Sequence, residues 1–398
     1  MKNSWYSPAA VLYVGTCLLL LGCAGGDLTP FDPSQQSGMA LHEDEKRIWG
    51  QSREEQLQLD RSGHLYDNSE ITDYVNRVAQ GLMPHQPEQS VLQVQVKIVR
   101  SPLLNAFAFP HGVIYVHTGI LARMDNEAQL ATLLGHELTH STHRHAVQSI
   151  RTIKNTSATL AGLGVVLLPF GYFGNLVAVL GQIGGMAAVT GYSRSLESEA
   201  DRVGLERMVA AGYDPHESPK LFEYLKRDLE EQKLDEPFFF GTHPKLVDRI
   251  EEFQEQVKDR YAARSGITNA EAFMTVMQPL FLENAKMDLA IGRFQSAESG
   301  LTRYLARYPQ DASAHYWLGE VYRQRGEEAD RDKAVQAFEK AIQVTPGFAD
   351  PYRSLGTMWF KQEQWKEAQS AFEQYLALSP AAADRAFIET YVEQLRKK

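Results

Sequence analysis

The sequence has only two cysteines, Cys17 and Cys23, and both lie near the amino terminus. The rest of the 398-residue chain therefore has no thiol that could form a disulfide framework or a cysteine-ligated zinc site. Any metal centre in the body of the protein has to use nitrogen and oxygen ligands.

The chain also lacks a basic excess and a long uninterrupted apolar run. Its 40 Lys and Arg against 50 Asp and Glu give a net charge of −10, which argues against nucleic-acid binding through a basic face. Residues 155–193 contain no charged side chain, but Pro169 and several glycines interrupt them, whereas a membrane span needs about 20 consecutive apolar residues. We interpret this segment as buried or amphipathic helices beside the functional site, and the alternative is a hairpin that dips into a membrane.

The amino terminus has the pattern of a bacterial secretory signal. Lys2 is the only charge in residues 1–22, and the apolar run 9–21 leads to a small residue and Cys23. This pattern resembles a lipobox, in which the cysteine is lipidated and becomes the first mature residue. We predict a signal peptide over 1–22, lipidation of Cys23 and a flexible tether over 23–40. The alternatives are a plain signal peptide cut nearby or an uncleaved anchor.

A metal-binding motif lies in the first half of the chain, where residues 136–140 read His-Glu-Leu-Thr-His. Residues four apart lie on one face of a helix, so His136 and His140 can point at one ion. A stripe of leucines around the motif predicts that this helix is buried. Glu137 is the expected general base, taking a proton from the attacking water. His143 and His145 follow closely. We interpret His143 as lining the same face, and His145 as a surface residue or a residue that contacts a metal ligand.

The third ligand of a catalytic zinc site should come from elsewhere in the chain, because such sites use three protein ligands and a water. Glu197 and Asp201 are four residues apart and would lie on one side of a helix. One carboxylate can bind the metal while the other orients a ligating histidine. Periodicity alone leaves both Glu197 and Glu199 open as the ligand, and a solvated acidic helix face is the alternative for the whole run.

These two motifs together resemble the gluzincin family of CAAX-type and HtpX-type membrane-associated zinc endopeptidases. The resemblance covers residues 41–260 and includes the pattern S-R-x-x-E-x-E-A-D at 193–201. It implies one zinc ion per chain, with Asp201 in support of the ligands. It also implies that His243 reaches the metal cleft, as a resting-state ligand or as a hydrogen-bond donor to the transition state. The implied zinc ligands are His136, His140 and Glu197.

Two β-rich runs, Val91–Val99 and Val113–Val116, predict neighbouring strands of a small sheet. Residues 105–108 resemble the strand that precedes the catalytic helix in the same family. We expect an extended substrate to add as a further strand beside Val113–Val116, which gives binding that depends little on substrate sequence.

The carboxy-terminal part of the chain is repetitive. Leu318 and Gly319 recur 37 residues later as Leu355 and Gly356, with three extra residues in the turn at 327–332. Two prolines that end repeats, at 346 and 380, give a period of 34 residues. This is the period of tetratricopeptide (TPR) repeats. We predict about two and a half units and a cap helix over 382–396, stacked into a concave groove that binds protein. The alternative is a purely structural helical tail.

The predicted fold is mainly α with a small β-sheet, an α+β zincin-type metalloprotease domain over 41–262, followed by an α-helical TPR solenoid over 263–398. A secreted form with a TPR tail is similar to the BepA-like periplasmic proteases. This similarity implies a zinc endopeptidase of the periplasm and outer membrane that degrades misfolded or stalled outer-membrane proteins. It implies as partners those substrates, the β-barrel assembly machinery through the TPR groove and a membrane through the lipid anchor, with no nucleic acid. The alternative is a chaperone or scaffold for β-barrel assembly with occasional proteolysis.

Overall fold

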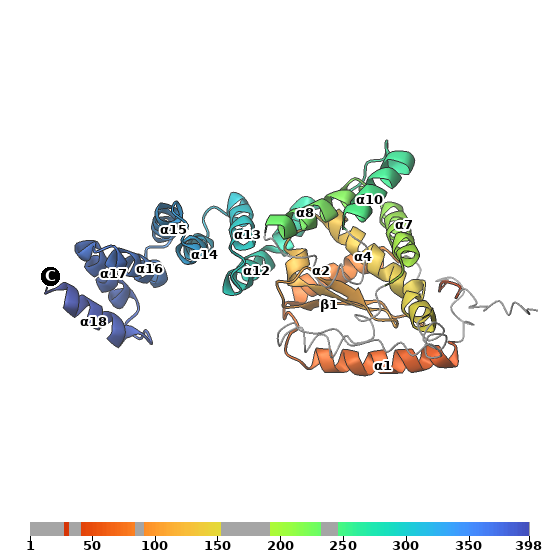
Figure 1. Ribbon diagram of the computed structural model, residues 1–398, viewed down its shortest axis with the longest axis horizontal. Coiled ribbons are helices and arrows are strands. Elements are labelled where there is room, and N and C mark those ends of the chain that lie inside the picture. Colours follow the sequence, from red (N-terminus) through yellow and green to blue (C-terminus); the bar gives the residue numbers. More distant parts are fainter. Residues whose placement is uncertain (1–27, 32–40, 84–90, 153–191, 232–245, 398) are drawn as a thin grey trace, which may run out of the picture.

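A computed structural model describes residues 28–31, 41–83, 91–152, 192–231 and 246–397 (Figure 1). The predictions for the signal segment, Cys23, residues 155–191 and His243 fall outside these residues. Across the described ranges, no helix combines the length and apolar character that a membrane crossing requires.

The predicted fold class is confirmed, since the chain is mainly helical with one small sheet. Helices α1 (Glu43–Asp60) and α2 (Ser69–Gly81) precede strands β1 (Gln95–Val99), β2 (Ala106–Ala108) and β3 (Val113–His117). The strand order is β1-β3-β2, with β1 parallel and β2 antiparallel to β3.

This strand order corrects the expected position of the substrate. Strand β3 is central and pairs on both sides, so its backbone groups are occupied and no further strand can add beside Val113–Val116. The outer edge of β1 is also closed, because the side-chain amide of Asn76 donates to the Val96 carbonyl and accepts from its N–H, both at 2.8 Å. Leu65 bridges Val99 further along the same edge. Within the described residues, β2 pairs with β3 alone.

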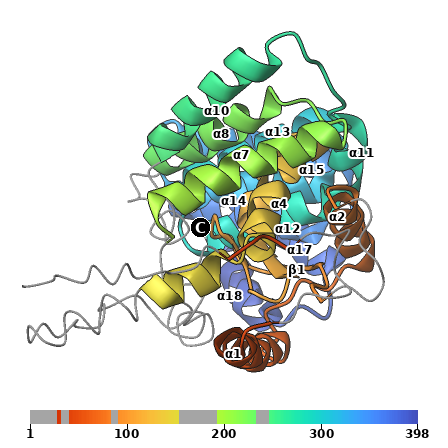
Figure 2. The same cartoon turned by 90° about the vertical axis from the view of Figure 1, so that its right-hand side faces the viewer.

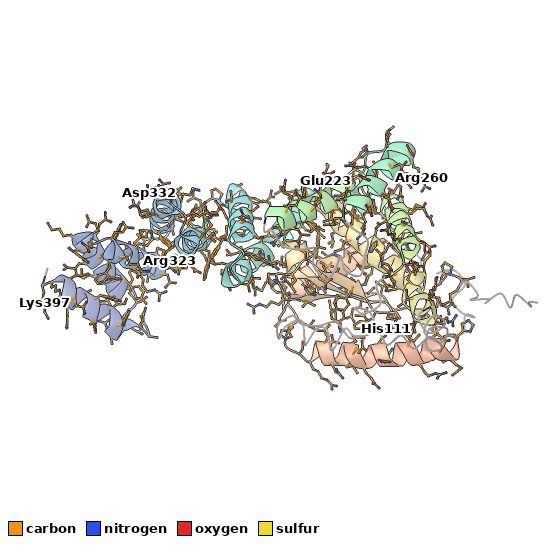
Figure 3. The ribbon with its side chains drawn as sticks, in the orientation of Figure 1. His111, Glu223, Arg260, Arg323, Asp332 and Lys397 are labelled. Carbon is orange, nitrogen blue, oxygen red and sulfur yellow. The ribbon has the colours of Figure 1, made fainter. Side chains whose placement is uncertain are left out.

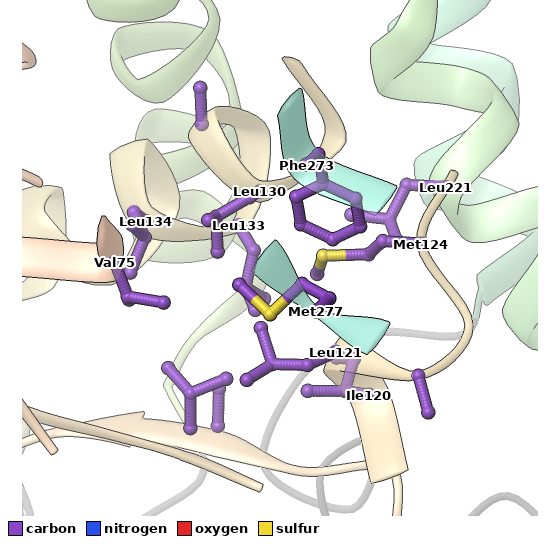
Figure 4. Close-up of a cluster of buried hydrophobic side chains, with 14 of the residues drawn as sticks. Val75, Ile120, Leu121, Met124, Leu130, Leu133, Leu134, Leu221, Phe273 and Met277 are labelled. Atoms are coloured by element: carbon purple, nitrogen blue, oxygen red, sulfur yellow. The ribbon is translucent and has the colours of Figure 1, made fainter. Parts of the chain in front are cut away.

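Helix α4 (Glu127–Thr142) runs through the centre of the amino-terminal part, and every one of its residues is buried. The Asn126 side chain caps its first turn by accepting from the backbone N–H of Gln129 at 3.0 Å. Leu130, Leu133 and Leu134 pack into the core shown in Figure 4. The described residues of this part also form α3 (Thr118–Leu121), α7 (Arg194–Ala210), α8 (Glu217–Glu231) and α10 (Leu246–Tyr261).

The repeat array consists of paired helices, and the first pair is complete rather than the predicted half unit. The pairs are α12 (Gln278–Ala290) with α13 (Phe294–Arg307), α14 (Ala312–Arg325) with α15 (Asp330–Val344), and α16 (Ala349–Lys361) with α17 (Trp365–Leu378). Helix α11 (Ala270–Val276) precedes them and α18 (Arg385–Leu395) follows.

Small residues hold the repeat pairs together. A Cβ atom at Gly319 would lie 2.5 Å from the ring of Phe338, and one at Gly356 would lie 2.6 Å from the ring of Phe372. The absence of a side chain therefore lets each aromatic ring fill the space between its paired helices. On the outside of the array, charged side chains such as Asp332 and Lys397 face the solvent (Figure 3).

The first repeat packs directly on the segment that leads into α4. The guanidinium of Arg303 donates to the Ala122 carbonyl and to the Asp125 carboxylate. Arg123 pairs in turn with Asp288 on α12 at 3.0 Å, and both side chains are largely buried. The array is thus anchored to the start of the catalytic helix, while the division at residue 262 stays a prediction.

Candidate metal centre

The structure brings His136, His140 and Glu197 together in the interior. The two Nε2 atoms lie 3.0 Å apart, and the Glu197 carboxylate oxygens lie 3.6 Å from His136 Nε2 and 3.4 Å from His140 Nε2. All three residues are buried and offer one ligand atom each within a 4.8 Å span.

These distances fit a tetrahedral zinc ion. Zinc bonds of about 2.0–2.1 Å to nitrogen and oxygen place neighbouring ligand atoms roughly 3.3 Å apart. The two Nε2 atoms lie 3.0 Å apart, and each has one Glu197 oxygen at a comparable distance, Oε2 at 3.6 Å from His136 and Oε1 at 3.4 Å from His140. The donor set of two imidazoles and one carboxylate is also typical of catalytic zinc sites with an open fourth position. Glu197, and not Glu199, is the carboxylate that the structure places with the two histidines.

Two glycines let the ligands meet. Helix α7 packs across α4 (Figure 2) with Gly204 against Gly135, and a Cβ at Gly204 would lie 2.8 Å from the backbone nitrogen of His136. The side chain of Ser193 caps the start of α7 by accepting from the N–H of Leu196, which puts Glu197 in the first turn. Gly135 directly precedes the motif at 136–140, and Gly204 follows Asp201 by three residues. This pair of glycines is the sequence signal that could have predicted the crossing of α4 and α7.

Asp201 lies directly against the first of the two histidines. Its Oδ1 atom lies 2.8 Å from His136 Nδ1, where the imidazole can donate its proton to the carboxylate while Nε2 faces the other members of the cluster. The buried guanidinium of Arg249 donates to the other carboxylate oxygen at 2.9 Å and lies over the ring of Phe222. Burial by itself lowers the pKa of Arg249, but the nearby carboxylates of Asp201, Glu197 and Glu137 together raise it above its ordinary value, so the guanidinium stays charged.

Glu137 and Tyr192 complete the interior of the site. Glu137 lies on α4 between the two histidine ligands and is buried. The ring of Tyr192 stacks on the imidazole of His140 at 4.0 Å. Burial raises the pKa of Tyr192, and the charges of Glu137 and Glu197 raise it further, so its hydroxyl stays protonated. Sequence reasoning missed Tyr192, although it stands next to the residue that caps α7.

Of the other described histidines near the sheet and α4, His143 and His145 lie close to the metal cluster, whereas His111 and His117 belong to the region of the sheet. His145 is completely buried and contacts His140, whereas His143 hydrogen bonds to the adjacent Thr142 side chain. His111 lies between the sheet and α1 (Figure 3), with its Nε2 atom 2.8 Å from the Gln56 side chain. His117 on β3 is buried with no hydrogen-bond partner for its ring within the described ranges, and burial lowers its pKa to about 3.

Comparison with known families agrees with this geometry. Residues 66–257 match Peptidase family M48, and residues 282–330 match a tetratricopeptide repeat family. The similarity predicted from the motifs is confirmed, and the matched residues 66–257 include the three clustered side chains of His136, His140 and Glu197.

Curated relatives carry the same kind of domain. The chain is 30% identical over 186 residues to the mitochondrial metalloendopeptidase OMA1 of Arabidopsis thaliana, covering 45% of this chain and 36% of that protein. It is 30% identical over 173 residues to a putative beta-barrel assembly-enhancing protease of Vibrio cholerae, covering 40% and 34%. It is 29% identical over 205 residues to the beta-barrel assembly-enhancing protease of Escherichia coli, covering 48% and 40%. The chain thus spans well under two thirds of the length of each relative.

Proposed function

We propose that this chain, a Peptidase family M48 domain followed by tetratricopeptide repeats, is a zinc-dependent endopeptidase of the bacterial periplasm. Its proposed substrates are misfolded or stalled outer-membrane proteins. The buried cluster of His136, His140 and Glu197 carries this proposal, because these donors suit zinc and Glu137 lies on the same helix. The substrate class is supported by the relatives named beta-barrel assembly-enhancing protease.

Hydrolysis would follow from the residues of α4 and α7. When bound, zinc polarises the scissile carbonyl and acidifies the attacking water. Glu137 accepts the proton of that water and donates it to the leaving amine. Asp201 keeps His136 in the tautomer whose Nε2 atom faces the metal, and Arg249 holds Asp201 in place. Because all of these groups are buried, their electrostatic interactions are stronger than they would be in water.

The substrate would bind as an added strand on the outer edge of β2. Strand β3 is paired on both sides and Asn76 closes the edge of β1, whereas β2 has one strand partner among the described residues. Helix α4 lies beside β2, where the Ser141 hydroxyl donates to the Phe109 carbonyl at 3.1 Å. Strand addition relies on backbone hydrogen bonds and tolerates many sequences. It suits unfolded barrel strands, which expose unpaired edges.

The TPR array would bring substrates or the β-barrel assembly machinery to the peptidase. An open groove runs along the first two repeats and is lined by Gln278, Tyr308 and Phe348 among others. Aromatic side chains are typical of protein-binding surfaces. A lipid on Cys23 would hold the protein on the periplasmic face of the outer membrane. No nucleic-acid partner is proposed, in line with the net charge of −10.

The replacement Glu137→Gln tests the proposed activity. It should keep zinc bound, because Glu137 is not a ligand, and should lower the rate of casein or barrel-protein cleavage by at least 10²–10⁴-fold. Replacing Glu54 by Gln on the exposed face of α1 is the matched control and should cleave at the wild-type rate. Wild-type cleavage by the Glu137→Gln protein would contradict the mechanism.

The alternative is a chaperone or scaffold in which binding by the repeats dominates. The length of the repeat array, three helix pairs against one catalytic domain, is the observation that favours it. The two functions can be separated by expressing variants in a cell that lacks the protein and measuring whether each variant restores the lost phenotype. Rescue by the inactive Glu137→Gln variant would favour the scaffold, and rescue by the wild type alone would favour the peptidase.

A further inference from the structure

A second series of hydrogen-bonded side chains leads away from the metal cluster, from His140 through His145 to Glu199. The Nδ1 atoms of His140 and His145 lie 3.0 Å apart, and His145 Nε2 lies 3.3 Å from Glu199 Oε2. We infer that His145 and Glu199 are positioning residues that fix the tautomer and the ring orientation of His140. This inference rests on the proposed zinc site but not on peptide cleavage.

The direction of the hydrogen bonds follows from the role of His140. Its Nε2 atom faces His136 Nε2 and the Glu197 carboxylate, so this nitrogen must be unprotonated to bind a metal. A neutral His140 then carries its proton on Nδ1 and donates it to His145 Nδ1. His145 in turn carries its proton on Nε2 and donates it to the acceptor-only carboxylate of Glu199. One arrangement of protons therefore satisfies both hydrogen bonds and leaves the Nε2 atom of His140 unprotonated.

A turn just after α4 brings His145 into contact with His140. The helix ends at Thr142, and Arg144 adopts a left-handed conformation with φ of 61°, which is uncommon for a residue other than glycine. The buried Arg144 guanidinium donates to Glu45 on α1 at 2.8 Å and anchors the turn. The turn brings His145 back against His140, with the ring centroids 5.0 Å apart.

Burial distinguishes His145 from a residue that merely fills space at the surface. His145 is 0% exposed, and a polar ring at such a position costs free energy unless its nitrogens are hydrogen bonded. Glu199 is the last residue of this hydrogen-bonded series, and its side chain is 36% exposed. The two ligating histidines are thus oriented differently, His136 directly by the Asp201 carboxylate and His140 through a second imidazole.

Zinc affinity measured by chelator competition tests this assignment without requiring cleavage. Replacing His145 by Phe keeps a ring of similar size but removes the acceptor, and it should weaken zinc binding by about 10–100-fold. Replacing His145 by Asn restores an acceptor near the position of Nδ1 and should recover most of the affinity. The matched control is His143→Phe, because His143 also faces Glu199, at 4.0 Å, but hydrogen bonds to Thr142 and not to a ligand. It should bind zinc within about twofold of the wild type.

The absorption spectrum of the cobalt-substituted protein provides a second readout, because it reports the geometry of the ligands. The His145→Phe spectrum should differ from that of the wild type, and the His145→Asn and His143→Phe spectra should match it. The inference is overturned if His145→Phe binds zinc as tightly as the wild type, if His143→Phe weakens binding equally, or if His145→Asn is as weak as His145→Phe. A wild-type protein that binds zinc without cleaving peptides would refute the proposed function alone, and one that binds no zinc would refute both.

Discussion

Replacing Gly204 by Ala should separate α7 from α4 and pull Glu197 away from the histidines. The new Cβ atom would lie 2.8 Å from the carbonyl carbon of Gly135 and from the backbone nitrogen of His136, whereas ordinary contacts are 3.4–4 Å. Neither backbone atom can rotate away, so the helices must move apart by about 0.6–1.2 Å, the difference between those values. A shift of about 1 Å at a catalytic site costs roughly 100-fold in rate, and overpacking a core costs about 1–3 kcal/mol of unfolding free energy.

The assay combines zinc affinity, cleavage rate and urea unfolding for Gly204→Ala and for Gly50→Ala. Gly50 is the matched control, because it lies in the exposed middle of α1 with no atom within 4 Å of an added Cβ. The control should raise the unfolding free energy by about 0.5–1 kcal/mol and leave zinc affinity unchanged. Wild-type zinc affinity and wild-type cleavage in Gly204→Ala would refute the argument that this helix crossing builds the site.

Three further replacements test other parts of the structure. Arg249→Leu leaves the buried Asp201 carboxylate without its cation and should lower the unfolding free energy in urea by about 3–5 kcal/mol; an unchanged midpoint would contradict the buried pair. Burial lowers the pKa of His117 to about 3 from 6.5, so the unfolded chain takes up a proton below pH 6.5 that the folded chain refuses, and stability is lost as the pH falls. His117→Leu should therefore shrink the drop in unfolding free energy between pH 8 and pH 5 by about 2 kcal/mol, and a drop equal to that of the wild type would be the contrary result. Phe338→Ala empties the space beside Gly319 and should destabilise the repeats by about 3–5 kcal/mol in thermal unfolding without changing zinc affinity, whereas a loss of zinc affinity would show that the repeats also support the metal site.

The sequence predicted those parts of the metal cluster that depend only on the geometry of a single helix. The four-residue spacing of His136 and His140 places both on one helix face, and helical periodicity allowed Glu197 and Asp201 to act together. Periodicity could not choose between Glu197 and Glu199, because that choice depends on which face of α7 packs on α4. The close approach of Gly135 and Gly204 fixes this face.

Features that depend on long-range pairing were less predictable. Val113–Val116 was expected to receive substrate, but the order of strands depends on contacts between distant segments, and β3 is central. The first repeat was expected as half a unit, because residues 278–290 contain no glycine at which the consensus could be aligned. The contact between His145 and His140 requires the left-handed turn at Arg144, which the sequence pattern of a helix does not indicate.

An anomalous-scattering map of the crystallised wild-type protein, collected on both sides of the zinc absorption edge, tests the central claim most directly. We predict one zinc ion per chain at about 2.0–2.1 Å from the Nε2 atoms of His136 and His140 and at a similar distance from the Glu197 carboxylate. A zinc ion bound at Glu199 or elsewhere, or a zinc-soaked crystal with no peak between α4 and α7, would contradict it.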